Sequence, residues 1–296
     1  MKEIAILGAT ASGKTALAIE VAKEVKANIL SLDSLAIYKE ADIVSAKPTK
    51  EQMQNVKHFG IDELYINEPF SVMTFFELYK KAKKSSLKEN KHLIIVGGTS
   101  FYLKSMIEGL SLKPTISNET KDKIQKILLN IPKAFSKIEK LDPKYSKKIS
   151  THDKYRIEKW YEIYLESGKV ATQYFEQNKK KAIIENIPIF NISVEKENLR
   201  EKIFKRTSSM IKAGLIDEIF QLEKKYNRQP TPMGAIGIKE TLLFLDGKID
   251  KKELENLIAI HTTQLAKRQD TFNNSQFTNQ IKLLNKDLKK EIKSIF

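Results

Sequence analysis

The chain has 296 residues, 41% of them hydrophobic, and it carries 52 Lys and Arg against 37 Asp and Glu, a formal net charge of +15. This length can bury a full core, and we expect a globular protein of two domains. There is no cysteine, which excludes disulfides, a thiol nucleophile and cysteine-based zinc sites. The positive charge favours a polyanionic partner such as nucleic acid, although a lysine-rich proteome produces the same excess.

The N-terminal residues predict a phosphate-binding loop. Residues 3–7 are mostly apolar and suit a buried parallel strand, and residues 15–22 have helical spacing. Between them, GATASGKT matches the pattern G-x-x-x-x-G-K-[ST]. Its glycines let backbone N–H groups converge, its lysine adds a positive charge, and its threonine hydroxyl can bind Mg²⁺. The predicted ligand is a diphosphate or polyphosphate, and the predicted binding residues are Gly8, Ala9, Thr10, Ala11, Ser12, Gly13, Lys14 and Thr15, with Thr15 as the metal ligand.

The sequence gives no sign of a membrane or secretory segment. The apolar run at residues 3–7 is too short for a signal peptide and leads straight into the phosphate loop. No apolar run approaches the length that a transmembrane helix needs. We therefore expect a cytoplasmic protein without a membrane partner. We also expect a monomer.

Strand and helix patterns alternate over the first hundred residues. Residues 28–32 and 92–96 are short apolar strands, and residues 74–87 and 100–108 have helical spacing. This alternation predicts a parallel α/β sheet that binds its ligand at the carboxyl ends of its strands. The ends that carry polar residues are the phosphate loop, Asp33-Ser34 and Gly97-Gly98-Thr99.

The strand pattern then disappears and Lys-rich helical segments follow. Residues 133–159 hold nine Lys and Arg against four Asp and Glu. Aromatic residues lie among them or directly after them: Tyr145, Tyr155, Trp160 and Tyr161. We predict a helical insertion domain, residues 113–188, between two parts of a core domain, residues 1–112 and 189–296. Basic residues with aromatic neighbours suit RNA, but a solvated helical face over core aromatics has the same composition.

The C-terminal part returns to the core pattern. Its predicted elements are a strand at residues 189–193, helices at residues 199–213, 217–226 and 251–268, and a loop at residues 230–237. Lys267 and Arg268 would then lie at a helix C-terminus. The Lys-rich tail from Asn285 onward is expected to fray.

The position of a second carboxylate indicates the chemistry. Nucleotide hydrolases use an Asp at the end of an apolar strand to hold Mg²⁺ and its waters, but the strand at residues 92–96 ends in Gly-Gly-Thr. The carboxylate follows the second strand instead, at Asp33, and this favours group transfer with Asp33 as a base beside a bound pyrophosphate. An Asp-Ser pair is also a common helix N-cap, so the residues alone leave both roles of Asp33 equally open.

Several blocks of the sequence together resemble the tRNA dimethylallyltransferase (isopentenyltransferase) family. They are GATASGKT, LDSLAIYKEADIVSAKP, LIIVGGTSFYLKSMIEGL, LDPKYSKKISTHDKYRIEKWYEIYLESGK, RTSSMIKAGLIDEI, AIGIKE and QLAKRQDTF, in order from about residue 4 to residue 272. This family transfers a dimethylallyl group from dimethylallyl diphosphate to N6 of the adenine just 3′ of the tRNA anticodon. The resemblance implies that reaction, a P-loop NTPase-like core with an inserted all-helical domain, Mg²⁺ as cofactor, and the tRNA anticodon stem-loop and dimethylallyl diphosphate as partners.

The resemblance also implies roles for single residues. Asp33 would be the general base toward the adenine amine, while Lys14, Thr99 and Arg206 would stabilise the departing diphosphate with Mg²⁺ on Thr15. The residues implied to contact tRNA are Asp33, Ser34, Leu35, Ala36, Thr99, Asp153, Arg156, Lys159, Lys267 and Arg268. Lys267, Arg268 and Gln269 match the family's A-K-R-Q block and would line the channel. Structural roles remain open for some of them: a surface ion pair for Arg206, a turn cap for Thr99, an orienting role for Asp153, and a helix C-cap for Lys267 and Arg268.

A few positions depart from the family's pattern. Phe272 and Asn274 stand where the family has Trp and Arg, Val44 stands where its D-I-G-T-A-K-P block has Gly, and Lys159 stands where Arg is usual. The zinc-finger extension of eukaryotic relatives is absent, and the bacterial form of the family fits best.

Other functions fit parts of the sequence. An adenylate isopentenyltransferase acting on free AMP or ATP would use the same chemistry, but it would not need so basic an insertion. A small-molecule kinase would need an Arg-rich lid, whereas Arg156 is the one arginine of the insertion. A non-catalytic RNA-binding protein with a vestigial loop would be expected to have lost Lys14, Thr15 or Asp33, and all three are present.

Overall fold

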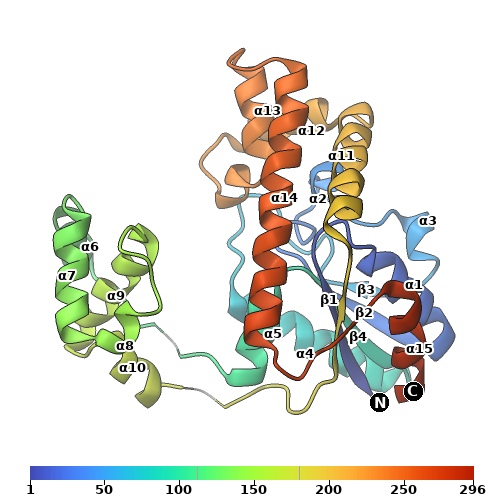
Figure 1. Ribbon diagram of the computed structural model, residues 1–296, viewed down its shortest axis with the longest axis horizontal. Coiled ribbons are helices and arrows are strands. Elements are labelled where there is room, and N and C mark those ends of the chain that lie inside the picture. Colours follow the sequence, from blue (N-terminus) through green and yellow to red (C-terminus); the bar gives the residue numbers. More distant parts are fainter. Residues whose placement is uncertain (112, 180) are drawn as a thin grey trace. The chain divides into compact units, whose positions relative to one another are not determined.

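The computed structural model describes residues 1–111, 113–179 and 181–296 (Figure 1). The chain divides into two compact units: unit 1 comprises Met1–Lys104 and Ile184–Phe296, and unit 2 comprises Ser105–Ile183. The boundaries predicted from the sequence, after residues 112 and 188, lie further along the chain, and residue 112 itself falls outside the described residues.

Unit 1 is built on a parallel sheet that has six strands over the described residues, in the order β3-β2-β4-β1-β5-β6. The strands are β1 (Glu3–Gly8), β2 (Ala27–Leu32), β3 (His58–Phe59), β4 (His92–Gly97), β5 (Ile189–Ile192) and β6 (Ile281–Leu283). The central strands β1 and β4 are runs of consecutive buried apolar residues, which is the pattern of a parallel sheet whose two faces are both covered. The predicted α/β core is therefore confirmed.

Helices cover this sheet. They are α1 (Lys14–Val25), α2 (Asp42–Ser45), α3 (Lys50–Met53), α4 (Val72–Lys88), α5 (Ser100–Glu108), α11 (Lys196–Lys212), α12 (Leu215–Tyr226), α13 (Ile238–Leu245), α14 (Lys251–Gln276) and α15 (Asn285–Ile295), with a 3-10 helix η1 (Thr231–Gly234). Helices α1 and α15 share one apolar cluster with the sheet, whereas α4 packs on β2 and β4. The long helices α11 and α14 lie against each other (Figure 1).

The strand order places the phosphate loop at the switch point of the sheet. Strand β1 lies between β4 and β5, and the chain leaves β1 through α1 toward β2 on one side, whereas it later adds β5 on the other side. In open α/β sheets the crevice for the ligand forms beyond the carboxyl ends of strands at such a point. Loop residues that follow β1 therefore lie at the position where a ligand is expected.

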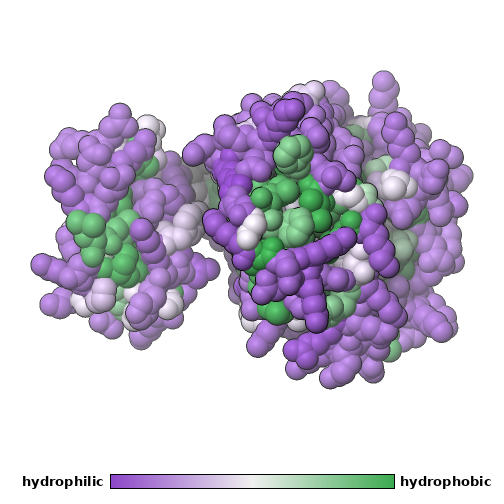
Figure 2. Space-filling model, turned by 90° about the horizontal axis from the view of Figure 1, so that it is seen from above, coloured by the Kyte–Doolittle hydropathy of each residue, from purple (hydrophilic) through white to green (hydrophobic). Residues whose placement is uncertain are grey.

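Unit 2 is helical and has a core of its own. Its helices are α6 (Asn118–Ile127), α7 (Ile131–Leu141), α8 (Pro143–Ser146), α9 (Lys154–Ser167) and α10 (Ala171–Gln177). Trp160 and Tyr161 are buried in this core, so these two aromatics have the structural role that the sequence left open, while Tyr155 is 66% exposed. Hydrophilic residues cover most of the visible surface of both units (Figure 2).

Two expectations about the C-terminal part were wrong. The Lys-rich tail forms helix α15, because Leu288, Ile292 and Ile295 recur at helical spacing and pack against α1 and the sheet. Helix α14 continues to Gln276, since neither Gly nor Pro follows Arg268 and the buried Asn273 extends its packed face. Lys267 and Arg268 therefore lie inside the helix, and the C-cap role considered for them is excluded.

Candidate functional site

The phosphate loop forms a tight turn between β1 and α1. Ala11 and Gly13 have positive φ angles of 61° and 90°, which turns successive N–H groups toward one side of the loop. A Cβ at Gly8 would lie 2.7 Å from Ser12 Oγ, so a larger residue there would displace the Ser12 side chain from the loop. The ammonium of Lys14 donates to the carbonyl of Ala9 at 3.2 Å and thus closes the loop upon itself.

The charge of Lys14 is sensitive to its surroundings. Burial of the ammonium lowers the pKa of Lys14 from 10.5 to about 8; the carboxylate of Asp33 opposes this shift and the guanidinium of Arg206 adds to it. Three charged groups that the sequence assigned to one reaction therefore lie near one another. A bound anion would favour the protonated form of Lys14.

Asp33 follows β2 directly and begins a turn. Its Oδ1 atom accepts hydrogen bonds from the backbone N–H groups of Leu35, at 2.8 Å, and Ala36, at 3.1 Å. No helix follows, because residues 34–37 form a turn, so Asp33 caps a turn rather than a helix. These bonds hold the carboxylate in place and use only Oδ1, which leaves Oδ2 available to a substrate.

Thr99 lies beside Asp33 because their strands are neighbours. Leu32 at the end of β2 pairs with Gly97 at the end of β4, and the N–H of Thr99 donates to the carbonyl of Leu32 at 3.1 Å. Gly97 also pairs with Leu7 of β1. The polar ends of the three strands thus meet at one edge of the sheet.

A cavity of about 180 Å³ lies over this edge within unit 1. Its polar part contains Thr10, Lys14, Asp33, Thr99 and Arg206, and its apolar part is lined mainly by α11 and α14. The lining residues of the two helices are Ile203, Arg206, Thr207 and Met210 from α11, and Ile258, Thr262, Leu265 and Gln269 from α14. Counted from Ile203 and from Ile258, the other lining residues lie three, four, seven or eleven positions further on, so each helix contributes one face.

Arg206 reaches the phosphate loop from α11. Burial lowers the pKa of Arg206 while the carboxylate of Asp33 raises it, and the side chain remains a cation because an arginine pKa is far above neutrality. Its Nη2 lies 3.5 Å from the carbonyl oxygen of Ser45, a residue that also lines the cavity. Arg206 is therefore a partly buried cation at the polar end of the cavity, and it forms no salt bridge with another residue of the described ranges.

Two larger clefts adjoin this cavity. One of about 810 Å³ shares Lys14 and Arg206 with it, and the other, of about 580 Å³, shares Ser34, Leu35 and Ala235. The cavity can thus be approached from the side of the phosphate loop and from the side of the turn after β2. Thr15 lines the first of these clefts.

Within unit 2, two predicted residues form a pair. Asp153 caps α9 by accepting from the N–H of Arg156, and its Oδ2 lies 3.0 Å from Nη1 of Arg156. The Arg156 side chain is 58% exposed, whereas that of Lys159 is 23% exposed and pairs with Glu158 and Glu162. Asp153 therefore orients Arg156, and Arg156 is the more accessible cation of the two.

Asp142 links several helices of unit 2. Its carboxylate accepts from Thr172, from the indole N–H of Trp160 and from the N–H of Tyr145. Burial alone would raise the pKa of Asp142, but these hydrogen bonds outweigh it and lower the pKa. The LDPKYS block of the sequence is thus a structural element of the helical unit.

Comparisons with known proteins identify the family. The model of the IPP transferase family matches residues 36–276. The chain belongs to the IPP transferase family. A curated tRNA dimethylallyltransferase of Aliarcobacter butzleri is 52% identical over all of this chain and 99% of its own length. A second, from a Sulfurovum species, is 51% identical over 95% of this chain and 94% of its own.

Solved structures agree with this assignment to the IPP transferase family. The tRNA isopentenylpyrophosphate transferase of Bacillus halodurans is 26% identical over 99% of this chain and 95% of its own, with a TM-score of 0.73. The enzyme of Staphylococcus epidermidis is 28% identical, with a TM-score of 0.69 over all of this chain and 99% of its own. These likenesses confirm the P-loop NTPase-like fold.

The fold of this IPP transferase brings together only part of the predicted site. Lys14, Asp33, Ser34, Leu35, Thr99, Arg206 and Gln269 line one cavity. Lys267 and Arg268 are exposed on α14 and do not line it, and Asp153, Arg156 and Lys159 lie in unit 2. No helix in the described part of the chain is long and apolar enough to span a membrane.

The resemblance implied that Gln269 lines the channel, and it does line the cavity. The contacts around α2 and the hydrogen bond from Thr10 to Gln269 were not predicted. Ser45 and Val44 line the cavity, and the Gln269 side chain contacts the phosphate loop. The block DIVSAKP and the block QLAKRQ pointed to these positions, but no sequence pattern shows which groups they contact.

Proposed function

We propose that this protein transfers a dimethylallyl group from dimethylallyl diphosphate to N6 of the adenine 3′ to the anticodon in tRNA. One observation carries the proposal: the phosphate loop and a fixed carboxylate, Asp33, line the same small cavity. The apolar part of this cavity is lined by α11 and α14. The phosphate loop suits a diphosphate, the turn after β2 suits the adenine, and the apolar faces of α11 and α14 suit a short hydrocarbon group. The full-length similarity to curated tRNA dimethylallyltransferases supports tRNA as the acceptor.

In the proposed reaction, N6 attacks the allylic carbon while the bond from that carbon to the diphosphate oxygen breaks. The adenine amine is a poor nucleophile because its lone pair is delocalised into the ring, so removal of its proton matters. Oδ2 of Asp33 would accept that proton while Leu35 and Ala36 hold Oδ1. Ser34, Leu35 and Ala36 would form the surface around the base, and Thr99 would contact it or the diphosphate.

Negative charge grows on the leaving diphosphate. The N–H groups of the loop from Gly8 to Thr15, the ammonium of Lys14 and the guanidinium of Arg206 would stabilise that charge. Groups that are fixed in advance and partly shielded from water stabilise charge more strongly than mobile solvent does. This arrangement explains why two cations occupy the polar end of a buried cavity.

Mg²⁺ fits this arrangement as a partner of the diphosphate. No cluster of three or more acidic or histidine side chains that could hold a metal occurs among the described residues, but the Thr15 hydroxyl lines the cleft at the loop. Mg²⁺ prefers substrate phosphate oxygens and water with few protein ligands, so Thr15 would complete its shell. When bound, Mg²⁺ would neutralise part of the charge of the leaving group.

Unit 2 would hold the anticodon stem-loop. Arg156 would contact the RNA, positioned by Asp153, with Lys159 beside it and Lys267 and Arg268 contributing from α14. An adenine inside a folded loop must be extruded before its N6 can enter a cavity, and this requires contacts to the surrounding backbone.

The purified protein would be mixed with Mg²⁺, dimethylallyl diphosphate and an unmodified tRNA that carries adenines beside its anticodon. Digestion and mass spectrometry should detect dimethylallyladenosine at that position. Free AMP and ATP serve as parallel acceptors. Product on free nucleotide instead of tRNA would overturn the choice of acceptor, and consumption of ATP without any prenylated product would overturn the reaction.

A further inference from the structure

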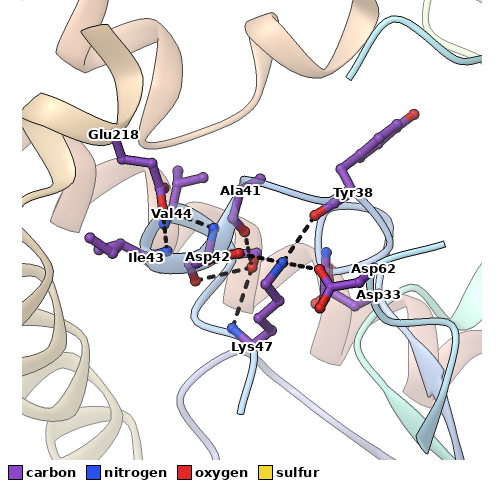
Figure 3. Close-up of polar contacts among 11 residues, drawn as sticks. Asp33, Tyr38, Ala41, Asp42, Ile43, Val44, Lys47, Asp62 and Glu218 are labelled. Carbon is purple, nitrogen blue, oxygen red and sulfur yellow. Dashed lines mark hydrogen bonds and ion pairs between the residues drawn. The ribbon is translucent and has the colours of Figure 1, made fainter. Parts of the chain in front are cut away.

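The carboxylate of Glu218 lies outside the cavity and binds the backbone of α2, which forms part of the cavity lining. Glu218 lies on α12 and reaches α2, the four-residue helix that carries Val44 and Ser45. Its Oε2 accepts from the N–H groups of Asp42 at 2.9 Å and Ile43 at 2.7 Å, and its Oε1 accepts from the N–H of Val44 at 2.9 Å (Figure 3). Every backbone donor of the first turn of α2 from Asp42 to Val44 is thus satisfied by one side chain.

This contact replaces a cap that α2 lacks. The residue at its N-cap position is Ala41, which makes no side-chain hydrogen bond, and a helix of four residues has little stability of its own. Burial raises the pKa of Glu218 and the nearby Asp42 carboxylate adds to the rise, while no salt bridge to a described residue opposes it. A carboxylate held only by three backbone amides is costly to bury, so its benefit lies in the geometry that it imposes on α2.

The other end of the same segment is fixed by Lys47. The Lys47 side chain is 7% exposed, and its ammonium lies 2.6 Å from Asp42 Oδ1, donates to the carbonyl of Tyr38 at 3.1 Å and pairs with Asp62 (Figure 3). Val44 packs against Gly237, where an added Cβ would lie 2.7 Å from Val44 Cγ2. Residues 42–47 are therefore held at both ends and in the middle.

Ser45 connects this segment to the phosphate end of the cavity. Its carbonyl oxygen lies 3.5 Å from Nη2 of Arg206, the far limit of a hydrogen bond, and both residues line the cavity. A small displacement of α2 would break this contact and release the guanidinium to other rotamers. The position of Arg206 thus depends on the position of α2.

We propose that Glu218 is a positioning residue for the diphosphate site: by capping α2 it fixes the Ser45 carbonyl, and through it the Arg206 guanidinium. The inference rests on the proposed function only in taking Arg206 to bind the diphosphate. Glu218 touches neither substrate nor the phosphate loop in this scheme. Its effect must therefore disappear when Arg206 is removed.

The test measures the affinity for inorganic pyrophosphate by titration calorimetry, so that it does not depend on prenyl transfer. The proteins are wild type, Glu218→Gln, Arg206→Ala and the double variant. Gln keeps the size of the side chain but offers one acceptor oxygen in place of two. We expect Glu218→Gln to weaken binding about threefold or more in the wild-type background, and to change it less than twofold in the Arg206→Ala background.

Asp217→Asn is the matched control. Asp217 lies in the same first turn of α12, so its substitution removes the same charge from the same helix terminus, but Asp217 is exposed and makes no hydrogen bond to α2. Pyrophosphate affinity should remain at the wild-type level. If Glu218→Gln fails to fold by circular dichroism, Glu218→Asp, which keeps the charge on a shorter side chain, takes its place in the cycle.

The possible outcomes distinguish a failure of the positioning role of Glu218 from a failure of Arg206 as a diphosphate-binding residue. Equal losses from Glu218→Gln with and without Arg206, or no loss at all, would overturn the positioning role while leaving the proposed function untouched. An Arg206→Ala variant that binds pyrophosphate as well as wild type would instead remove Arg206 from the diphosphate site, and the inference would fall with that assignment.

Discussion

The side chain of Gln269 accepts a hydrogen bond from the backbone N–H of Thr10, with Oε1 2.8 Å from the nitrogen. This bond ties α14 to the phosphate loop, although 259 residues separate the two partners along the chain. The amide nitrogen of Gln269 faces Gly98, where an added Cβ would lie 2.3 Å from Nε2. Gln269 therefore touches the ends of β1 and β4 at once, and its orientation depends on the absence of a side chain at Gly98.

Gln269→Ala should weaken pyrophosphate binding, because it releases Thr10 and loosens the loop. Gly98→Ala should have a similar effect, since the new methyl group displaces the Gln269 amide. The two effects should overlap in the double variant, because both act through one hydrogen bond, with a net worth of about 1 kcal/mol. Gly234→Ala, at a glycine with open space around it, is the control, and additive losses would refute the shared cause.

Asp33→Asn should reduce prenyl transfer about 10²- to 10⁴-fold, because it removes the base but keeps an oxygen that can accept from Leu35 and Ala36. Pyrophosphate binding should stay the same or become tighter, since a negative charge near Lys14 and Arg206 is lost. Single-turnover rates and calorimetry on the same protein check both points. Parallel loss of rate and binding would show that Asp33 supports the site rather than acting as its base.

Binding of pyrophosphate should depend on pH through Lys14. The pKa of Lys14 is lowered to about 8 in the free protein, so binding near neutrality meets a protonated ammonium, and affinity should fall as the pH rises through 8. In the unfolded chain Lys14 keeps its ordinary pKa of 10.5, so between pH 8 and 10.5 the unfolded chain binds more protons than the folded protein. The free energy of unfolding of the free protein therefore rises with pH across this window, as the buried ammonium loses its proton.

Comparison with Lys14→Ala cancels the titration of pyrophosphate itself. The difference in log affinity between the two proteins should be constant below pH 7 and shrink above pH 8. A difference that stays constant from pH 7 to pH 10 would mean that Lys14 keeps its ordinary pKa in the site.

The sequence predicted those parts of the site that are local or that follow from sheet topology. The phosphate loop is one contiguous pattern, and Asp33 and Thr99 come together because the carboxyl ends of β2 and β4 lie side by side in a parallel sheet. The contact of Glu218 with α2 spans 176 residues and depends on how α12 packs, which no local pattern encodes. Helix α15 was not predicted for a different reason. Its apolar residues do have helical spacing, but its many lysines made the segment resemble a solvated tail.

Arg156 should contribute more to tRNA binding than Lys159. Its side chain is 58% exposed, while that of Lys159 is 23% exposed and already paired with two carboxylates. Arg156→Ala should weaken binding and reduce the slope of log affinity against log salt by about 1, whereas Lys159→Ala should change the slope less. Filter binding of an anticodon stem-loop over a range of salt checks this. An unchanged slope in the double variant would exclude both residues from the RNA interface.

Met210 should limit the length of the prenyl donor. It follows Arg206 by one turn on the face of α11 that lines the cavity, about 6 Å further from the phosphate loop, which is close to the length of one C5 unit. A C10 chain that extended along this face would meet the Met210 side chain, which lines the cavity of about 180 Å³. Met210→Ala should therefore transfer a geranyl group from geranyl diphosphate to tRNA. The wild type should use dimethylallyl diphosphate but not geranyl diphosphate. Phe204→Ala, at an exposed position of the same helix, should behave as wild type. If the wild type already uses geranyl diphosphate, or if Met210→Ala still rejects it, the limit on donor length lies elsewhere in the cavity.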